Sequence, residues 1–358
     1  MVSINLVKSL QARRAIQKGE SASQTRDPVP QANENELDPS KRTRKPTWKV
    51  SESGVSSVPD SAAYKNAAYE KLLKESGCFL KSAERPNSKS AKMCRRLLEH
   101  DVAPPAASLF QDELLQYTVR RLEKRNEARV VMDLTRLLVP SAESLAIHHE
   151  ERQYSYFYET INEGWIRCMK ITSPRPQPDY AVGFKKQAFS AVQLRKAQPF
   201  IGTDDHLSYF KATREMLFPF LACEVKADET DFPAARRQNT HSMAVAVRGV
   251  VALFKLLGEE HTLDQKVLAF SVVHDRSSVM IHGHYPITTA GTGQVNCYTV
   301  SLYQGRFTDT IGAGSRGRWT SFQFVMNVYR IWAPAHFEML CSAMERLPNV
   351  PNAYLDQK

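Results

Sequence analysis

Two stretches of the chain combine a buried-strand pattern with acidic residues: PQPDYAVGF at residues 176–184 and FPFLACEVK at residues 218–226. In both, a short run of apolar and aromatic residues is bounded by turn or charged residues, which is typical of a strand. Asp179 opens the first strand, and Glu224 closes the second. Because side chains alternate along a strand, Glu224 and Lys226 project to the same side. We therefore expect Asp179, Glu224 and Lys226 to meet where two adjacent strands end.

The segments around these stretches predict an α/β domain with a mixed sheet. A long helix is expected over 234–257, directly after the second stretch, and a final helix over 321–346, bent or interrupted by Pro334. Further apolar runs bounded by turn residues predict strands at 267–273, 279–286 and 297–303. Strands, a crossover helix and then more strands are the order expected of an α/β fold.

Composition divides the chain into four parts. Residues 1–60 are polar, basic and rich in Ser, Pro and Asn, and we expect a disordered arm there. Residues 61–139 carry apolar residues at helical spacing. Arg120, Arg121, Lys124 and Arg125 form a basic stripe on the last of these helices, with an ordinary solvated helix face as the favoured interpretation. The α/β domain is expected over 140–347, followed by a tail at 348–358.

The charge balance favours a polyanionic partner. Lys and Arg number 48 against 38 Asp and Glu, so the formal net charge is +10, and basic surface attracts phosphate backbones. No membrane span is expected, because the best apolar run, 244–257, is interrupted by Arg248 and Lys255. The six cysteines lie far apart without a CxxC pair, which fits reduced intracellular thiols and argues against a zinc site.

The predicted cluster has the residues that metal-assisted phosphodiester hydrolysis requires. Two carboxylates and a backbone carbonyl suit Mg²⁺, a hard cation that prefers oxygen ligands and keeps several waters. A neighbouring lysine can orient the attacking water and stabilise charge on the phosphate. Similar short patterns occur at Asp264-Gln265-Lys266 and Pro59-Asp60, but the first precedes its strand and the second lies in the polar arm.

This order of motifs resembles the PD-(D/E)XK nuclease superfamily, whose fold is the restriction-endonuclease-like mixed β-sheet flanked by helices. Residues 140–347 also look like an uncharacterised fungal family that has been linked to that superfamily. The resembling segments are PQPDYAVGF, FPFLACEVK, RRQNTHSMAVAVR (236–248), HGHYP (282–286) and NVYRIWAPAHF (327–337).

The resemblance implies a role for each motif residue. Asp179, Glu224 and the carbonyl of Val225 would bind Mg²⁺ or Mn²⁺, Lys226 would be the catalytic lysine, and Gln238 would support the site. Some branches place a Tyr four residues after this Gln, where the present chain has Ser242. The 45-residue step from Asp179 to Glu224 also requires an inserted segment, about 189–216, which carries Asp204, Asp205, Lys211 and Arg214.

Three other groups of residues have side chains suited to a functional role. Glu159 and Glu163 lie four apart and would share a helix face, with surface carboxylates as the favoured interpretation. His282 and His284 alternate on one strand face, and structural histidines are favoured over a metal pair. The segment 312–318, rich in Gly and Arg, favours a flexible loop over a phosphate-binding loop, although its two arginines could contact a nucleic-acid backbone.

The predicted function is therefore a Mg²⁺-dependent nuclease acting on DNA or RNA. The alternative is an inactive nuclease-fold protein that binds nucleic acid or another protein. Replacing Asp179 or Lys226 by Ala is expected to abolish cleavage and leave folding intact. The Lys41–Lys45 cluster favours the nucleus, whereas the first nineteen residues, which lack acidic side chains, keep the mitochondrion as an alternative.

Overall fold

The computed structural model of the chain describes residues 60–81, 84–148, 151–288, 295–309 and 316–349. Residues from Asp60 onward form one compact unit. The expected disordered arm lies outside the described residues, and with it the Lys41–Lys45 cluster and the first nineteen residues.

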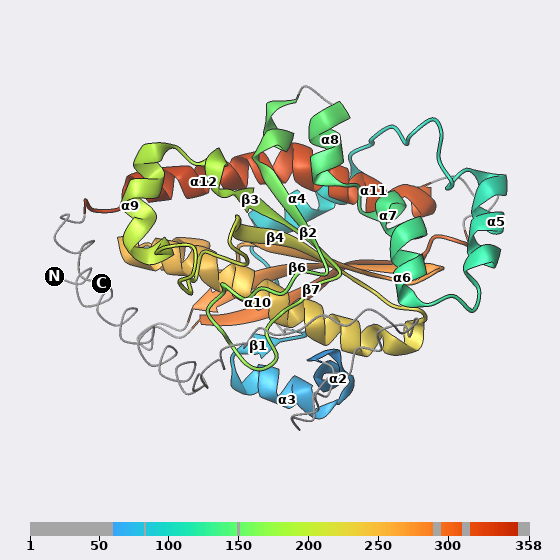
Figure 1. Cartoon of the computed structure of the whole chain (residues 1–358), viewed down its shortest axis with the longest axis horizontal. Helices are drawn as coiled ribbons and strands as arrows, with labels where there is room; N and C mark the ends of the chain where they lie inside the picture. The colour runs from blue at the N-terminus through green and yellow to red at the C-terminus, as the bar shows by residue number, and fades with distance from the viewer. Residues whose placement is uncertain (1–59, 82–83, 149–150, 289–294, 310–315, 350–358) are drawn as a thin grey trace, which may run out of the picture. The chain divides into compact units, whose positions relative to one another are not determined.

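The described residues contain a seven-stranded mixed sheet in the order β1-β7-β6-β5-β4-β3-β2 (Figure 1). Strands β2, β3 and β4 form an antiparallel meander, β5 lies parallel to β4, and β6 and β7 return antiparallel. The short β1 joins the outer edge parallel to β7. The strands are β1 (Cys78–Phe79), β2 (Phe157–Ile161), β3 (Tyr180–Lys185), β4 (Met216–Val225), β5 (Ala269–His274), β6 (Ser278–Thr288) and β7 (Val295–Arg306).

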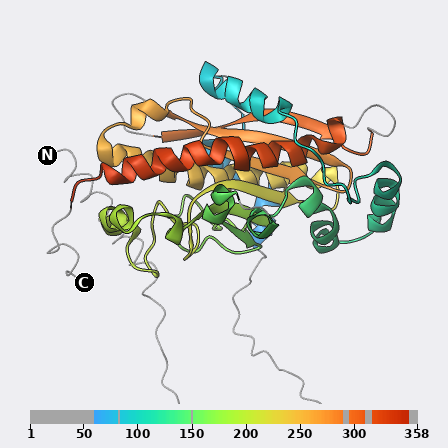
Figure 2. The same cartoon turned by 90° about the horizontal axis from the view of Figure 1, so that it is seen from above.

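Helices cover both faces of this sheet (Figures 1 and 2). Phe270 of β5 packs edge-on against Phe324 and Trp332, from the C-terminal helices α11 (Arg316–Asn327) and η6 (Val328–Trp332). Val273, on the opposite side of the same strand, packs against Phe232 and Ala235 of α10 (Phe232–Leu257). The sheet with helices on both faces confirms the mixed α/β prediction.

All five strands predicted from apolar runs are present, as β3 to β7. Strands buried on both faces carry continuous apolar sequence, which makes them easy to predict. All ten residues of β4 and all six of β5 are buried. The final helix is interrupted, as expected, but by a π-helical turn at η6 that comes just before Pro334. Pro334 lies in the first turn of α12 (Ala333–Glu345), where its missing N–H costs no helical bond.

The N-terminal helices pack onto the α/β core. Arg237 of α10 donates from Nε to the carbonyl oxygen of Tyr64 at 2.7 Å, and the Tyr64 hydroxyl hydrogen-bonds Nδ1 of His241 at 2.8 Å. These bonds hold α2 against α10. The remaining helices are α2 (Asp60–Lys65), α3 (Ala68–Glu75), α4 (Ser88–Glu99), α5 (Asp112–Leu122), α6 (Glu127–Val130), η1 (Val131–Thr135), α7 (Arg136–Leu138), α8 (Ala142–His148), η2 (Arg152–Tyr156), η3 (Lys186–Ala188), α9 (Ala191–Ile201), η4 (Glu229–Asp231) and η5 (Glu260–Leu263).

The prediction of a helix at Glu159 was wrong. Residues 157–161 form β2, which pairs with β3 through Glu159 and Val182, and Glu163 follows in an irregular segment. Tyr, Phe, Thr and Ile in this segment favour a strand, and that preference outweighs the four-residue spacing of the two acids.

One helical stretch in the described part of the chain, Glu229–Leu257, is long and apolar enough to cross a membrane, with a mean hydropathy of 1.4. Of the apolar window within it, 78% is buried inside the protein, where α10 packs on the sheet. Its apolar character is that of a core helix.

Candidate functional site

Asp179 and the Glu224–Lys226 motif lie side by side at one end of the sheet. Asp179 directly precedes β3, Glu224 and Val225 are the last two residues of β4, and Tyr180 pairs with Cys223 across the two strands. The carboxylate of Asp179 accepts a hydrogen bond from the backbone N–H of Val225 at 2.7 Å. The antiparallel register thus brings together two residues 46 positions apart in sequence.

Lys226 lies at the centre of this group. Its ammonium donates to the Val225 carbonyl oxygen at 2.8 Å and lies 3.7 Å from Oε2 of Glu224. A second carboxylate, Glu127 at the start of α6, has Oε1 4.0 Å from the same nitrogen. The Lys226 backbone N–H donates to the His274 carbonyl at 2.9 Å, which ties the motif to the end of β5.

The group around Lys226 contains more carboxyls than cations. Glu224 is 1% exposed, and burial raises the pKa of its carboxyl well above the usual value, with a further rise from Asp179 that the attraction of Lys226 does not offset. Burial also raises the pKa of Asp179, although Lys226 and the Val225 N–H act against this. For Lys226, burial lowers the pKa, but Glu224, Asp179 and Glu127 together outweigh it and leave the pKa raised. Three carboxyls therefore share one ammonium.

Sequence reasoning did not identify Glu127. It lies in a charged stretch after α5, where Asn126 caps α6 by accepting a hydrogen bond from the Arg129 N–H at 3.1 Å. Nothing in the local pattern distinguishes it from the other charged residues of that stretch. Only the packing of α6 beside the end of β4 brings it to Lys226.

Gln238 is the seventh residue of α10 and is half-buried. Among the described residues, its side chain makes no hydrogen bond to Asp179, Glu224 or Lys226. Its neighbour Asn239 instead donates to the Val272 carbonyl at 2.8 Å and fastens α10 to β5.

The polar atoms offered by Asp179, Glu224 and Val225 are oxygens, the atom type that Mg²⁺ prefers as a ligand. Across the described ranges, no group of three or more His, Cys, Asp or Glu side chains is arranged to hold a metal. Asp179, Glu224 and the Val225 carbonyl supply three oxygens, and Mg²⁺ characteristically takes a few carboxylates and completes its shell with water. A divalent cation would also neutralise the excess of carboxyls that burial disfavours.

A family model matches this part of the chain: a domain of unknown function, DUF7924, over residues 114–344. The chain belongs to the DUF7924 family. No curated protein matches the chain, and no solved structure does either. The DUF7924 match includes Glu127, Asp179, Glu224, Lys226 and Gln238, whereas α2, α3, β1 and α4 precede it.

His274 and His284, two buried histidines of the DUF7924 domain, hydrogen-bond hydroxyl side chains of the fold. His284 lies between the hydroxyls of Ser271 at 2.8 Å and Thr299 at 3.2 Å, one on each ring nitrogen, and burial lowers its pKa well below the usual value. Burial lowers the pKa of His282 to about 4. His274 hydrogen-bonds the Thr135 hydroxyl at 2.9 Å, which holds η1 against the end of β5.

Glu159 is a structural carboxylate, and the expectation that it lies on the surface was wrong. Its side chain is 10% exposed and accepts hydrogen bonds from the hydroxyls of Tyr180 at 2.8 Å and Ser141 at 2.8 Å. An ion pair with Arg136 at 3.2 Å completes its surroundings. Glu159 therefore joins β2, β3 and the start of α8 and does not belong to the Lys226 cluster.

The charged residues of the 189–216 segment form bonds within the domain. Asp204 pairs with Arg214 at 2.7 Å and Asp205 with Arg167 at 2.7 Å, while Lys211 donates to the Thr203 carbonyl at 2.7 Å. Arg318, expected at a loop, is 2% exposed and donates to the Phe110 carbonyl at 2.9 Å. Residues 310–315 of that predicted loop lie outside the described residues.

Proposed function

We propose that this DUF7924 protein is a Mg²⁺-dependent nuclease with a restriction-endonuclease-like fold, which hydrolyses phosphodiester bonds of DNA or RNA. The observation that carries the proposal is the meeting of Asp179, Glu224 and Lys226 at one end of the sheet, with the lysine ammonium 3.7 Å from Glu224. The order of elements supports it: the Pro-Asp pair opens one strand, Glu-Val-Lys closes its neighbour, and α10 follows, as the resemblance to the PD-(D/E)XK superfamily implies.

Each residue of the cluster has a role under this proposal. Asp179, Glu224 and the Val225 carbonyl would hold Mg²⁺, with Mn²⁺ as a substitute, and Gln238 would support the site from α10. When bound, the cation would polarise the phosphate and lower the pKa of a water. Lys226 would stabilise the charge that develops on the phosphate, a stabilisation that is larger in a site shielded from bulk water.

The test compares two matched substitutions in the full chain. Asp179→Asn keeps an oxygen that can accept from the Val225 N–H and removes the charge. Asp264→Asn makes the same change in the similar motif before β5, where Asp264 accepts from the Thr288 N–H at 2.8 Å. Labelled single- and double-stranded DNA and RNA are incubated with Mg²⁺, Mn²⁺ or EDTA.

We expect metal-dependent cleavage by wild type and by Asp264→Asn, and a loss of about 100-fold or more in Asp179→Asn, the size of effect seen when one transition-state contact is removed. Calorimetry should show Mg²⁺ binding that vanishes in Asp179→Asn alone. Full cleavage by Asp179→Asn would contradict the assignment of this residue.

A second candidate, a non-catalytic binding module of the same fold, is favoured by one observation. Two of the three groups proposed to bind the metal already accept hydrogen bonds within the protein: Asp179 accepts from the Val225 N–H, and the Val225 carbonyl accepts from Lys226. Under this proposal the cluster fastens β3, β4 and α6 together, and nucleic acid or a protein binds elsewhere. Absence of Mg²⁺ binding in wild type would favour it.

A further inference from the structure

A positively charged surface lies next to the candidate site, at the end of α5 and in the turn that follows. Its four cations are exposed: Arg120, Arg121, Lys124 and Arg125, here called the α5 cationic surface. Within the described part of the chain none of them forms an ion pair, and Glu123 is the one acidic residue among them. Four exposed cations within six residues attract a polyanion at close range.

Two contacts fix this surface beside the candidate site. Glu127, two residues after Arg125, has its carboxylate 4.0 Å from the Lys226 ammonium. Arg276, in the turn after β5, donates from Nη1 to the Leu122 carbonyl at the end of α5, at 3.4 Å. A nucleic-acid strand bound along the α5 cationic surface would therefore lie close to Lys226.

The start of α5 is also anchored, so the helix projects from the edge of the molecule with both ends held (Figure 1). Phe110 is fully buried and its ring stacks on Phe307 at 5.4 Å, while Arg318 donates to its carbonyl. Leu115 and Leu122 form the buried side of α5. The opposite side exposes Tyr117, 64% exposed, three and four residues before Arg120 and Arg121 and thus beside them on the helix surface.

An exposed tyrosine next to arginines is suited to unpaired bases. Aromatic rings stack on bases of any sequence, and neighbouring cations bind the backbone that joins those bases. A duplex keeps its bases stacked on one another and offers only its phosphates to such a surface.

We propose that the α5 cationic surface binds the phosphates of single-stranded nucleic acid, that Tyr117 stacks on an unpaired base, and that the bound strand runs toward Lys226. The last part rests on the proposed function, whereas binding can be measured without metal or cleavage.

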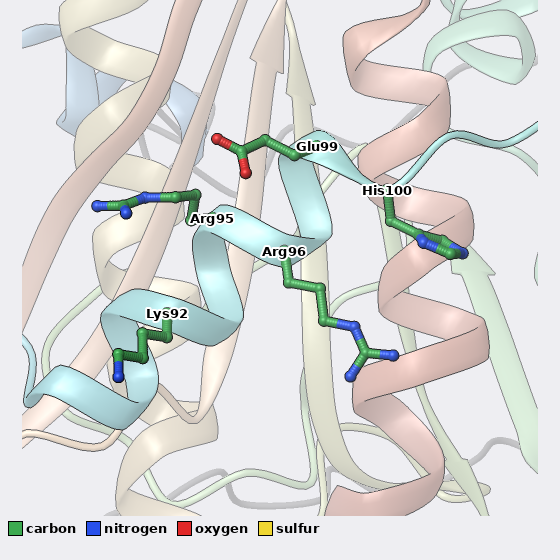
Figure 3. A pocket seen from close by; sticks show the side chains of 5 residues that line it. All are labelled: Lys92, Arg95, Arg96, Glu99 and His100. Atoms are coloured by element: carbon green, nitrogen blue, oxygen red, sulfur yellow. The ribbon is translucent and has the colours of Figure 1, made fainter.

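The chain offers a matched control on α4. A surface hollow on this helix is lined by Lys92, Arg95, Arg96, Glu99 and His100. Figure 3 shows these side chains extending from the helix. They are exposed, but α4 begins at the opposite end of β5 from the candidate site, where Ser90 accepts from the Val267 N–H at 3.1 Å. The sequence of α4 contains no aromatic residue.

The experiment measures binding of a fluorescein-labelled 20-nucleotide strand of mixed sequence, and of its duplex, by anisotropy in EDTA. One triple variant carries R120Q, R121Q and K124Q, and the other carries K92Q, R95Q and R96Q, so each lowers the net charge from +10 to +7. Losing three phosphate contacts should reduce the salt slope by about 2 and the affinity at 0.1 M salt on the order of 100-fold. The α4 variant should change affinity by less than about 5-fold.

Tyr117→Ala should weaken single-strand binding on the order of 10-fold and leave duplex binding unchanged, and Tyr117→Phe should restore it. Equal losses in the two triple variants, unchanged affinity in the α5 variant, or no binding by wild type would each overturn the proposal. Equal effects of Tyr117→Ala on strand and duplex would remove the stacking role.

The experiments can refute the nuclease proposal and the α5 proposal independently of each other. A chain that binds through α5 but never cleaves would contradict the nuclease and leave the α5 proposal standing. A chain that cleaves while its α5 variant keeps full affinity would do the reverse.

Discussion

Replacing Lys226 by Met is expected to destabilise the fold strongly, because the change leaves Glu224 buried without its counter-charge. Coulomb's law for unit charges at the observed 3.7 Å gives about 4.5 kcal/mol with an effective dielectric constant of about 20. Removing one partner of a buried ion pair typically costs about 3–5 kcal/mol, which agrees. Glu127 is 45% exposed, so its pair with Lys226 adds at most about 1 kcal/mol.

A double-mutant cycle measured by urea unfolding isolates this interaction. Lys226→Met should lower the free energy of unfolding by about 3–5 kcal/mol, and adding Glu224→Gln should restore most of it, so that the two changes couple by about 4 kcal/mol. Lys266→Met, the same change in the similar motif before β5, serves as the control. Additive effects of the two substitutions, with coupling under about 1 kcal/mol, would refute the buried pair.

The expected instability of Lys226 variants changes the choice of substitution for functional work. The sequence alone predicted that Lys226→Ala would abolish cleavage and leave folding intact, but the burial of Glu224 makes loss of folding the expected outcome. Asp179→Asn is the cleaner substitution, because the amide oxygen can still accept the Val225 N–H.

Three further predictions concern acid sensitivity, packing and metal binding. Burial lowers the pKa of His336 to about 3, so the unfolded chain binds a proton at this residue more tightly than the folded chain, and its contribution to stability falls by about 2 kcal/mol between pH 7 and pH 5. In urea unfolding, His336→Phe should lose less stability than wild type over this range, by that amount. Gly249→Ala should lower the melting temperature, because the new Cβ would lie 2.5 Å from the Tyr209 carbonyl oxygen, and this clash should outweigh the better helix propensity of Ala. An unchanged or higher melting temperature would show that the backbone around Tyr209 moves to accommodate the methyl group. Mg²⁺ binding should release protons and weaken as pH falls, since burial raises the pKa of both Asp179 and Glu224, and calorimetry in two buffers of different ionisation enthalpy would detect this.

The sequence predicts the centre of the sheet well and its edges poorly. Strands β3 to β6 are recognisable because most of their residues are buried and apolar. Strand β7 is recognisable from its aromatic and β-branched residues, although only two of its twelve residues are buried. Strand β2 has only five residues, two of them half-buried and one exposed, so its apolar pattern is weak. Strand β1 has two residues and is defined by pairing of Cys78 with Cys297, far away in sequence, which no local pattern encodes.

The same distinction applies to the candidate site. Asp179, Glu224 and Lys226 follow from strand ends and alternation, which are local properties of the sequence. Glu127 depends on how η1 packs, through the bond between Thr135 and His274, and tertiary packing of this kind leaves no periodic signal. The α5 cationic surface is recognisable in the sequence as a run of basic residues, but only the three-dimensional structure shows that it lies beside Lys226.

The stability effect of Glu224→Gln alone distinguishes the two candidate functions. Glu224 has a raised pKa even with Lys226 nearby, so its surroundings disfavour its charge. Because Lys226 keeps Asp179 and Glu127 as counter-charges after Glu224→Gln, this variant should be about as stable as wild type near neutral pH. If the cluster served only to fasten β4 to α6, the native charge would be expected to contribute stability, and the glutamine variant would lose several kcal/mol. A buried carboxylate whose charge lowers the stability of the metal-free fold is instead what a cation-binding site requires, because a bound cation stabilises that charge. A stable Glu224→Gln beside an unstable Lys226→Met would therefore favour the nuclease over the binding module.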